Sequence, residues 1–205
     1  MLFSRELWEK EFASKINPYV EDVVNNGVDF GAEQLVSMGA DFEIGKQQVL
    51  DFIDEYNVRL SKRLWPEVNQ ETYEQLRDTM KESVAADETA AELRKRIDVV
   101  FDNAVQYRSE RIARSETVRA FNEGQIEGWR ISDVVEGKEW LMEFDDRTCE
   151  FCVLMDGAVE ELNSEYFAKD DSMDGAQNTL NFDYSSIESP PLHPNCRCTL
   201  LAVLK

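Results

Sequence analysis

The residues best suited to carry chemistry in this sequence are four cysteines and one histidine near its end. They occur as Cys149-x-x-Cys152 and His193-x-x-Cys196-x-Cys198, and the 205-residue chain contains no other cysteine or histidine. A C-x-x-C turn places two thiolates on one side of a tight turn, and a second pair from a distant segment can complete a tetrahedron around zinc. The spacing therefore predicts a structural Zn²⁺ site that closes the intervening chain into a loop.

Five candidate ligands compete for the four positions around a tetrahedral ion. We expect Cys149, Cys152 and Cys196 to bind, with either His193 or Cys198 as the fourth ligand. A C-x-C pair can chelate one ion, but a strand beginning at Cys198 would alternate its side chains and could turn one of the two thiols away. This argument favours His193 and leaves Cys198 as the alternative.

Other interpretations of the cysteines fit less well. The amino terminus lacks the apolar segment that export requires, so we expect synthesis in a reducing cytoplasm, where disulfides are rare. A thioredoxin-like redox pair would require its C-x-x-C at the start of a helix that follows a strand, and it would not need the downstream sequence from His193 to Cys198. Ordinary buried thiols are a further alternative.

The predicted zinc site is expected to be structural, and we therefore expect no enzymatic activity. Three or four sulfur ligands make an ion a poor Lewis acid, whereas a catalytic ion usually keeps one position open for water. Asp145, Asp146 and Glu150 are close to the first cysteine pair in sequence, but a solvated acidic turn explains them equally well. A zinc-dependent hydrolase or nuclease is the alternative, and it would require a water ligand in a cleft containing Asp145 or Asp146.

The elements that must position these ligands change in character along the chain. Apolar residues repeat at helical intervals from Val49 to Leu64, and a T-x-x-E capping box at Thr89 predicts the start of another helix. Residues 1–45 are predicted to form short helices joined by turns, because Pro18 and four glycines interrupt their apolar pattern.

A further helix is predicted over about 109–129. Small side chains recur along one face of it, where another backbone could lie close, and packing is the simplest explanation. The stripe consists of Ala113, Thr117, Ala120, Phe121, Gly124 and Gly128.

After Trp129 the pattern predicts β structure. Residues 134–144 are expected to form a hairpin with its turn at Glu136-Gly137, and residues 198–204 a strand buried against it. Residues 168–189 are rich in Asp, Ser, Asn and Gly and are predicted to be a long surface loop.

The expected fold class is α+β, with a mostly helical N-terminal body followed by a small zinc-clamped β-hairpin or sheet lobe. Three segments are predicted: an N-terminal helical extension (1–45), a helical body (46–130) and a zinc-binding β lobe (131–205). The helical body and the β lobe together form one domain.

The composition disfavours several classes of protein. Forty-two acidic and 22 basic side chains give a net charge of −20, which opposes nonspecific binding of the whole surface to nucleic acid. The longest apolar runs are far shorter than the roughly 20 residues that span a bilayer, so no membrane partner is expected. The segment from Arg94 to Arg119 is more basic. A solvated face explains it, and a docking patch for protein or DNA is the alternative, with these candidate residues: Arg108, Arg111, Arg114, Glu116 and Arg119.

Several of these motifs together resemble the phage Mu protein F-like family of head morphogenesis, or minor head, proteins. The resemblance covers about residues 47–201 and rests most on two sequences, RTCEFC over 147–152 and PPLHPNCRC over 190–198. The helical sequence IARSET over 112–117, with Asn122 downstream, is less specific, and it has Ser115 where the family usually has threonine. Further matching positions are Trp140, Asp145 or Asp146, and Asp156-Gly157.

The resemblance implies a structural or assembly component of the phage head, present in few copies and associated with the portal. It would be needed for capsid assembly or DNA delivery, and it would lie in the interior of the virion head. The implied partners are portal and major capsid proteins, with packaged DNA as a weaker candidate because the acidic surface repels it. The alternative function is a zinc-dependent hydrolase or nuclease acting during infection.

Overall fold

The computed structural model describes residues 5–40, 45–60, 78–79, 82 and 90–205. The chain divides into two compact units, and each combines segments that are distant in sequence. All five predicted zinc ligands belong to the second unit. The first unit is Met1–Asn17 with Glu55–Ala113, and the second is Pro18–Asp54 with Arg114–Lys205. The three segments proposed from the sequence stay a prediction.

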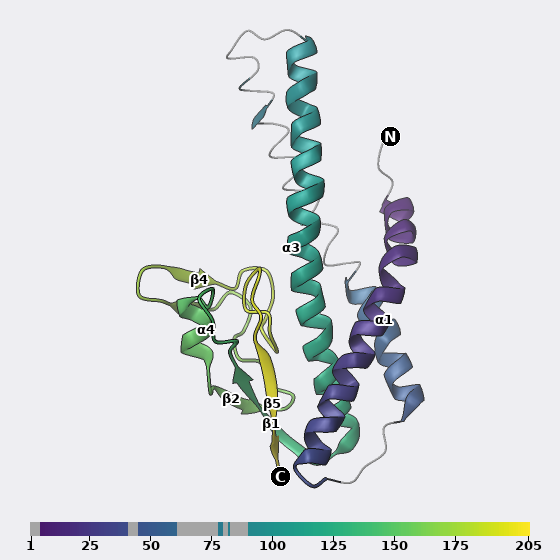
Figure 1. Cartoon of the computed structure of the whole chain (residues 1–205), viewed down its shortest axis with the longest axis vertical. Coiled ribbons are helices and arrows are strands. Elements are labelled where there is room, and N and C mark those ends of the chain that lie inside the picture. Colours follow the sequence, from purple (N-terminus) through teal and green to yellow (C-terminus); the bar gives the residue numbers. More distant parts are fainter. Residues whose placement is uncertain (1–4, 41–44, 61–77, 80–81, 83–89) are drawn as a thin grey trace. The chain divides into compact units, whose positions relative to one another are not determined.

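Long helices form the first part of the chain (Figure 1). α1 extends over Arg5–Ser37, residues 46–60 are helical, and α3 extends over Ala90–Ser132. The prediction of a separate helix over 109–129 is wrong, because residues 90–123 contain neither glycine nor proline to interrupt α3. None of the helices in the described part of the chain combines the length and the apolar character that crossing a bilayer requires.

The helix predicted from Val49 is confirmed as far as Leu60. Its last expected turn, which ends at Leu64, and the capping residue Thr89 lie outside the described residues. The structure therefore supports the helical periodicity of this region where it can be compared.

α1 corrects the prediction of short helices joined by turns, since it continues through its internal proline and glycines. Gly27 is needed within α1 because the α3 backbone passes against it. A Cβ at Gly27 would lie 2.1 Å from the carbonyl oxygen of Phe121, and a Cβ at Gly124 would lie 2.5 Å from the carbonyl oxygen of Val24. These glycines permit close helix packing, which confirms the predicted role of the small-residue stripe at Gly124.

The last third of the chain forms a small β lobe with two antiparallel sheets (Figure 1). The first sheet has the strand order β2-β1-β5, and β3 pairs with β4 in the second. Helices followed by small antiparallel sheets confirm the predicted α+β class. The elements of the lobe are β1 Val135–Leu141, α4 Glu150–Met155, β2 Val159–Glu161, β3 Ser172–Asp174, β4 Thr179–Asn181 and β5 Thr199–Leu204.

The predicted hairpin with a turn at Glu136-Gly137 is wrong. Both residues lie inside β1, where Gly137 pairs with Glu161 of β2 and with Val203 of β5. The two neighbours of β1 come from distant parts of the chain, so local turn chemistry could not reveal them. The strand predicted over 198–204 is confirmed as β5.

The segment 168–189, predicted to be a surface loop, contains β3 and β4. Phe182 within it is fully buried and stacks on Phe167, with ring centroids 4.5 Å apart. Tyr184 donates a hydrogen bond to the carbonyl oxygen of Leu192, 2.8 Å away. Aromatic packing therefore anchors this segment and fixes the chain directly before His193.

One hydrophobic core joins the lobe to the helices of the second unit. Trp129 of α3, Trp140 of β1, Leu200 of β5 and Leu35 of α1 are all fully buried and belong to the same cluster. Burial on this scale supplies the main driving force for packing the lobe on the helices. Three of the cysteines also belong to this core: Cys152, Cys196 and Cys198.

Lys138 of β1 is a buried cation within this unit, with 1% of its surface exposed. Its Nζ donates to the carbonyl oxygens of Leu162 and Ser164, 3.1 and 2.6 Å away, and lies 5.6 Å from the centre of the Tyr166 ring. Burial lowers the pKa of Lys138 from 10.5 to about 8, although the negative charge of Glu188 acts in the opposite direction. Between these two values the unfolded chain holds a proton that the folded chain has released.

We therefore expect the free energy of unfolding to rise with pH between about 8 and 10.5. At about 1.4 kcal/mol per pKa unit, the rise should be up to about 3 kcal/mol. Denaturant unfolding of the full chain at several pH values measures it. The variant Lys138→Met is the control, because it lacks the titrating group and should show a much flatter profile. An equally steep rise in that variant would show that other groups cause the pH dependence.

Candidate metal centre

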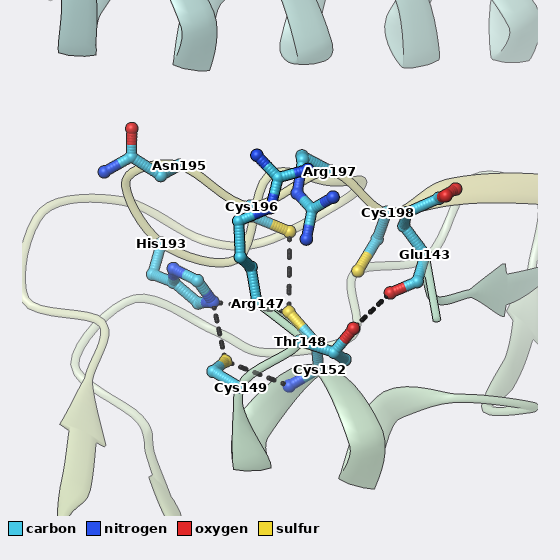
Figure 2. A pocket seen from close by; sticks show the side chains of 10 residues that line it. All are labelled: Glu143, Arg147, Thr148, Cys149, Cys152, His193, Asn195, Cys196, Arg197 and Cys198. Carbon is cyan, nitrogen blue, oxygen red and sulfur yellow. Dashed lines mark hydrogen bonds between the residues drawn. The ribbon is translucent and has the colours of Figure 1, made fainter. Parts of the chain in front are cut away.

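The first cysteine pair is positioned by the start of α4. Cys149 is the N-cap residue, with extended backbone (φ −87°, ψ 163°), and Cys152 lies on the buried face of the helix. The backbone N–H of Cys152 points at the Cys149 sulfur, 3.5 Å away, as it would toward the oxygen of an N-cap serine. The helix start therefore brings both sulfurs to one side (Figure 2).

The second ligand segment is a tight turn from His193 to Cys196. The Cys196 N–H donates to the carbonyl oxygen of His193, 3.1 Å away, and Asn195 has a positive φ of 65°. Proline at the second position and asparagine at the third are typical of a turn that requires positive φ at the third. The sequence His-Pro-Asn-Cys thus bends the chain and presents the His193 ring and the Cys196 sulfur together.

The two segments meet in what we call the cysteine–histidine cluster, formed by all five predicted ligands (Figure 2). His193 Nε2 lies 3.0 Å from the Cys149 sulfur and 3.3 Å from the Cys152 sulfur. The sulfurs of Cys152 and Cys196 are 3.8 Å apart. Cys198 forms a second group with Cys152 and Cys196, with ligand atoms within 4.8 Å of one another. Cys152 is common to both groups.

Zinc–sulfur bonds of about 2.3 Å and zinc–nitrogen bonds of about 2.0 Å place two sulfurs about 3.8 Å apart and a sulfur and a nitrogen about 3.5 Å apart in a tetrahedral site. The Cys152–Cys196 separation matches this geometry, and the two nitrogen–sulfur separations are shorter. The five donors form two groups of three that share Cys152, and no four of them lie within 4.8 Å of one another. The cluster lines a cavity of about 20 Å³. Because about 10 to 15 Å³ accommodates one water-sized sphere, the cavity has room for an ion.

His193 is oriented for metal binding by its other ring nitrogen. Nδ1 lies 2.8 Å from the carbonyl oxygen of Pro194, and a carbonyl oxygen can only accept a hydrogen bond. Nδ1 therefore carries the proton, and Nε2 presents its lone pair toward Cys149 and Cys152. Metal-binding histidines usually donate their second N–H in this way. The contact favours His193 as a ligand and leaves Cys198 beside it as the alternative.

The buried sulfurs of the cluster are electrostatically suited to a cation. Hydrogen bonding by Cys152 and Cys198 lowers the pKa of Cys196, and the contact with Cys196 raises the pKa of Cys152. The neighbouring thiols thus favour a thiolate at Cys196. A divalent cation would stabilise every thiolate that it contacts, and sulfur with imidazole is a donor set that suits zinc.

An ion pair beside the cluster connects the two ligand segments. Arg197 lies between Cys196 and Cys198 and donates from both terminal nitrogens to the two carboxylate oxygens of Asp145, with Nη2 2.6 Å from Oδ1. Arg147 adds a bond of 3.1 Å. The Arg197 guanidinium holds the pKa of Asp145 well below its usual range. This pair was not predicted, because 52 residues separate its partners.

The other two carboxylates considered as catalytic bases differ in their surroundings. Glu150 accepts a hydrogen bond of 2.6 Å from the backbone N–H of Ala176, in the connection between β3 and β4. Asp146 is exposed. Of the three carboxylates near the first cysteine pair, Asp145 and Glu150 thus have structural partners.

The candidate partner-binding residues all lie along α3. Arg111 is partly exposed and Arg114 is exposed, whereas the side chain of Arg108 lies outside the described part of the chain. Glu116 and Arg119 form an ion pair of 3.8 Å within the helix. Pairs of this kind contribute only some tenths of a kcal/mol, about 0.3 to 0.5. A docking role for these residues stays a prediction.

Comparison with known proteins identifies the family. A family model described as "Phage Mu protein F like protein" matches residues 74–201. No curated protein and no solved structure matches the chain. The matched region covers more than half of the sequence and contains the whole cysteine–histidine cluster together with all of α3. The chain therefore belongs to the phage Mu protein F-like family.

Proposed function

We propose that this chain is a phage head morphogenesis protein, a structural component needed for capsid assembly or DNA delivery. Membership of the family suggests this class of function, and it is the single observation that carries the proposal. In this role the chain is present in few copies, lies in the interior of the head and associates with the portal or the major capsid protein.

In this function a zinc ion clamps the β lobe, bound by Cys149, Cys152, His193 and Cys196. The contacts of His193 Nε2 with the Cys149 and Cys152 sulfurs, the Cys152–Cys196 contact and the orientation of His193 support this ligand set. Binding one ion with all four donors requires Cys196 to move closer to Cys149 and His193, because the donors lie in two groups that share Cys152. When bound, zinc supplies a fixed crosslink between α4 and the segment that leads into β5. The strands of the lobe are three to seven residues long, and sheets of this size gain much of their stability from such a crosslink.

The proposed role is not enzymatic. Four protein donors would complete the coordination of the ion, whereas a catalytic zinc keeps a position for water. Asp145 is engaged by Arg197 and Arg147, so it is poorly suited to act as a general base. A hydrolase or nuclease activity that is lost when zinc is removed would contradict this part of the proposal.

The basic part of α3 is proposed to contact the portal, the capsid interior or packaged DNA. Its candidate residues are Arg108, Arg111 and Arg114, in a chain that is otherwise strongly acidic. Reversing all three charges should reduce incorporation into heads or DNA delivery, with circular dichroism as the control for helix content. Unchanged incorporation and delivery in a folded variant would remove the basis of this contact.

The head function is tested in the phage that encodes this chain. Deleting the chain should reduce infectious, DNA-filled particles, and supplying it in trans should restore them. Mass spectrometry of purified heads should find it, with chemical crosslinks to the portal. Normal heads after deletion, together with its absence from purified wild-type particles, would overturn the proposal.

A further inference from the structure

We propose that Asn122 of α3 is a positioning residue for the metal centre, through which the helix fixes the backbone of the Cys196-Arg197-Cys198 segment. This inference rests on the zinc clamp proposed above and concerns a residue outside the cysteine–histidine cluster. Asn122 lies 76 residues before Cys198 in sequence and reaches its carbonyl oxygen in space.

Asn122 is buried, with 1% of its surface exposed, and its side-chain amide has hydrogen-bond partners at both the nitrogen and the oxygen. Nδ2 donates to the carbonyl oxygen of Val118, 2.8 Å away in the preceding turn of α3, and to the carbonyl oxygen of Cys198, 3.3 Å away. The Thr199 hydroxyl lies 3.1 Å from Oδ1. The bond to Val118 fixes the rotamer, so the second N–H is aimed at the chain between Cys198 and Thr199.

Asn122 is one of three residues whose side-chain amides bond to backbone groups along β5 or next to its start. β5 is an edge strand of its sheet. Gln34 of α1 donates to the carbonyl oxygen of Leu200 over 3.3 Å and accepts from the Ala202 N–H over 3.4 Å. Gln125 of α3 also points its Nε2 at the Leu200 carbonyl, 3.4 Å away. These side chains satisfy backbone groups that would otherwise be buried without partners.

Asn122 differs from the two glutamines in what it holds. Gln34 and Gln125 bond to the strand itself, whereas Asn122 bonds to the carbonyl of a cluster cysteine. In the same segment, the Arg197 side chain is bound by Asp145. The backbone that carries the Cys196 sulfur is therefore held at the two residues that follow it before any ion binds.

A ligand that is already in position loses less conformational entropy when the ion binds. Groups that orient metal ligands from outside the coordination sphere typically change metal affinity 10- to 100-fold when they are removed. Loss of Asn122 should weaken metal binding by about this factor. By thermodynamic linkage, metal binding should in turn strengthen the attachment of α3 to the lobe.

The test uses the full chain loaded with Co²⁺, whose visible spectrum reports coordination, in competition with a chromophoric chelator. Asn122→Ala should bind Co²⁺ 10- to 100-fold more weakly than the unmodified chain. Gln34→Ala is the matched control, because it removes two bonds to the same strand at a site farther from the ligands. It should keep Co²⁺ affinity within about threefold, even where its loss of thermal stability is similar.

Asn122→Asp provides a second, nearly isosteric variant. It keeps an acceptor for Thr199 but presents a carboxylate oxygen to the Cys198 carbonyl, so its Co²⁺ affinity should fall as in Asn122→Ala. Equal Co²⁺ affinity for Asn122→Ala and Gln34→Ala, or unchanged affinity in Asn122→Asp, would overturn the positioning role while leaving the clamp intact. No Co²⁺ uptake by the unmodified chain would overturn the clamp and the positioning role together.

Discussion

Replacing Cys152 with serine should abolish stoichiometric metal binding and unfold the β lobe at 25 °C. Cys152 belongs to both groups of potential ligands, and its sulfur contacts His193 Nε2 and the Cys196 sulfur. Structural zinc contributes on the order of 10 kcal/mol to folding, which is comparable with the whole stability of a small domain. Elemental analysis of the natively purified chain and thermal unfolding with and without a chelator measure the two effects.

Cys198→Ser is the matched control, because Cys198 is equally buried but lies outside the proposed ligand set. We expect this variant to retain one equivalent of zinc and to lose about 1 to 3 kcal/mol from burying a hydroxyl in place of a thiol. Loss of zinc from Cys198→Ser but not from His193→Gln would identify Cys198 as the fourth ligand. An unmodified chain that carries no transition metal and melts identically in a chelator would show that the clamp does not exist.

Gly27→Ala should destabilise the second unit by about 2 to 3 kcal/mol, although alanine is the better helix former. The added Cβ would lie 2.1 Å from the carbonyl oxygen of Phe121, so the backbones of α1 and α3 must separate. Overpacking of this kind costs about 3 kcal/mol or more, and the helix propensity of alanine returns only about 1 kcal/mol. Chemical denaturation of the full chain measures the net loss.

Gly128→Ala serves as the comparison on the facing helix. There the nearest atom to an added Cβ, the carbonyl oxygen of Val28, is 3.2 Å away, which a small shift can relieve. The cost and the propensity gain should nearly cancel, leaving stability within about 1 kcal/mol of the unmodified chain. Equal stability of Gly27→Ala and Gly128→Ala would contradict the role of Gly27 as the point of closest helix approach.

Parts of the candidate site could be predicted from local sequence. The spacing of the cysteines and the histidine indicated which side chains would converge, whereas the helix that Cys149 caps and the turn through Pro194 and Asn195 were not predicted. The partners of these residues could not be predicted in the same way. Arg197 and Asn122 meet Asp145 and the Cys198 carbonyl across long separations in sequence, and no local pattern marks such contacts.

Glycine gave the least reliable local signal. In residues 1–45 it predicted turns, yet Gly27 lies within a continuous helix because a second backbone needs the space. Gly137 predicted a hairpin turn, yet it lies in the central strand of a sheet, where a Cβ would be 3.0 Å from the carbonyl oxygen of Glu160. A glycine can be required at a position because of its conformational freedom or because there is no space for a side chain. Only the packing shows which of these two reasons holds at a given position.

By itself the sequence determined the chemistry of this protein: the identity of the soft donors, their pairing in two short segments and the α+β composition. These properties depend on residue types and on residues a few positions apart. The tertiary structure alone decided that β1 joins β2 to β5, that α1 and α3 touch through glycines, and that His193 directs Nε2 at two sulfurs. Each of these depends on segments brought together by a shared core, because burial is non-directional and leaves the choice of partners to the packing of the whole unit.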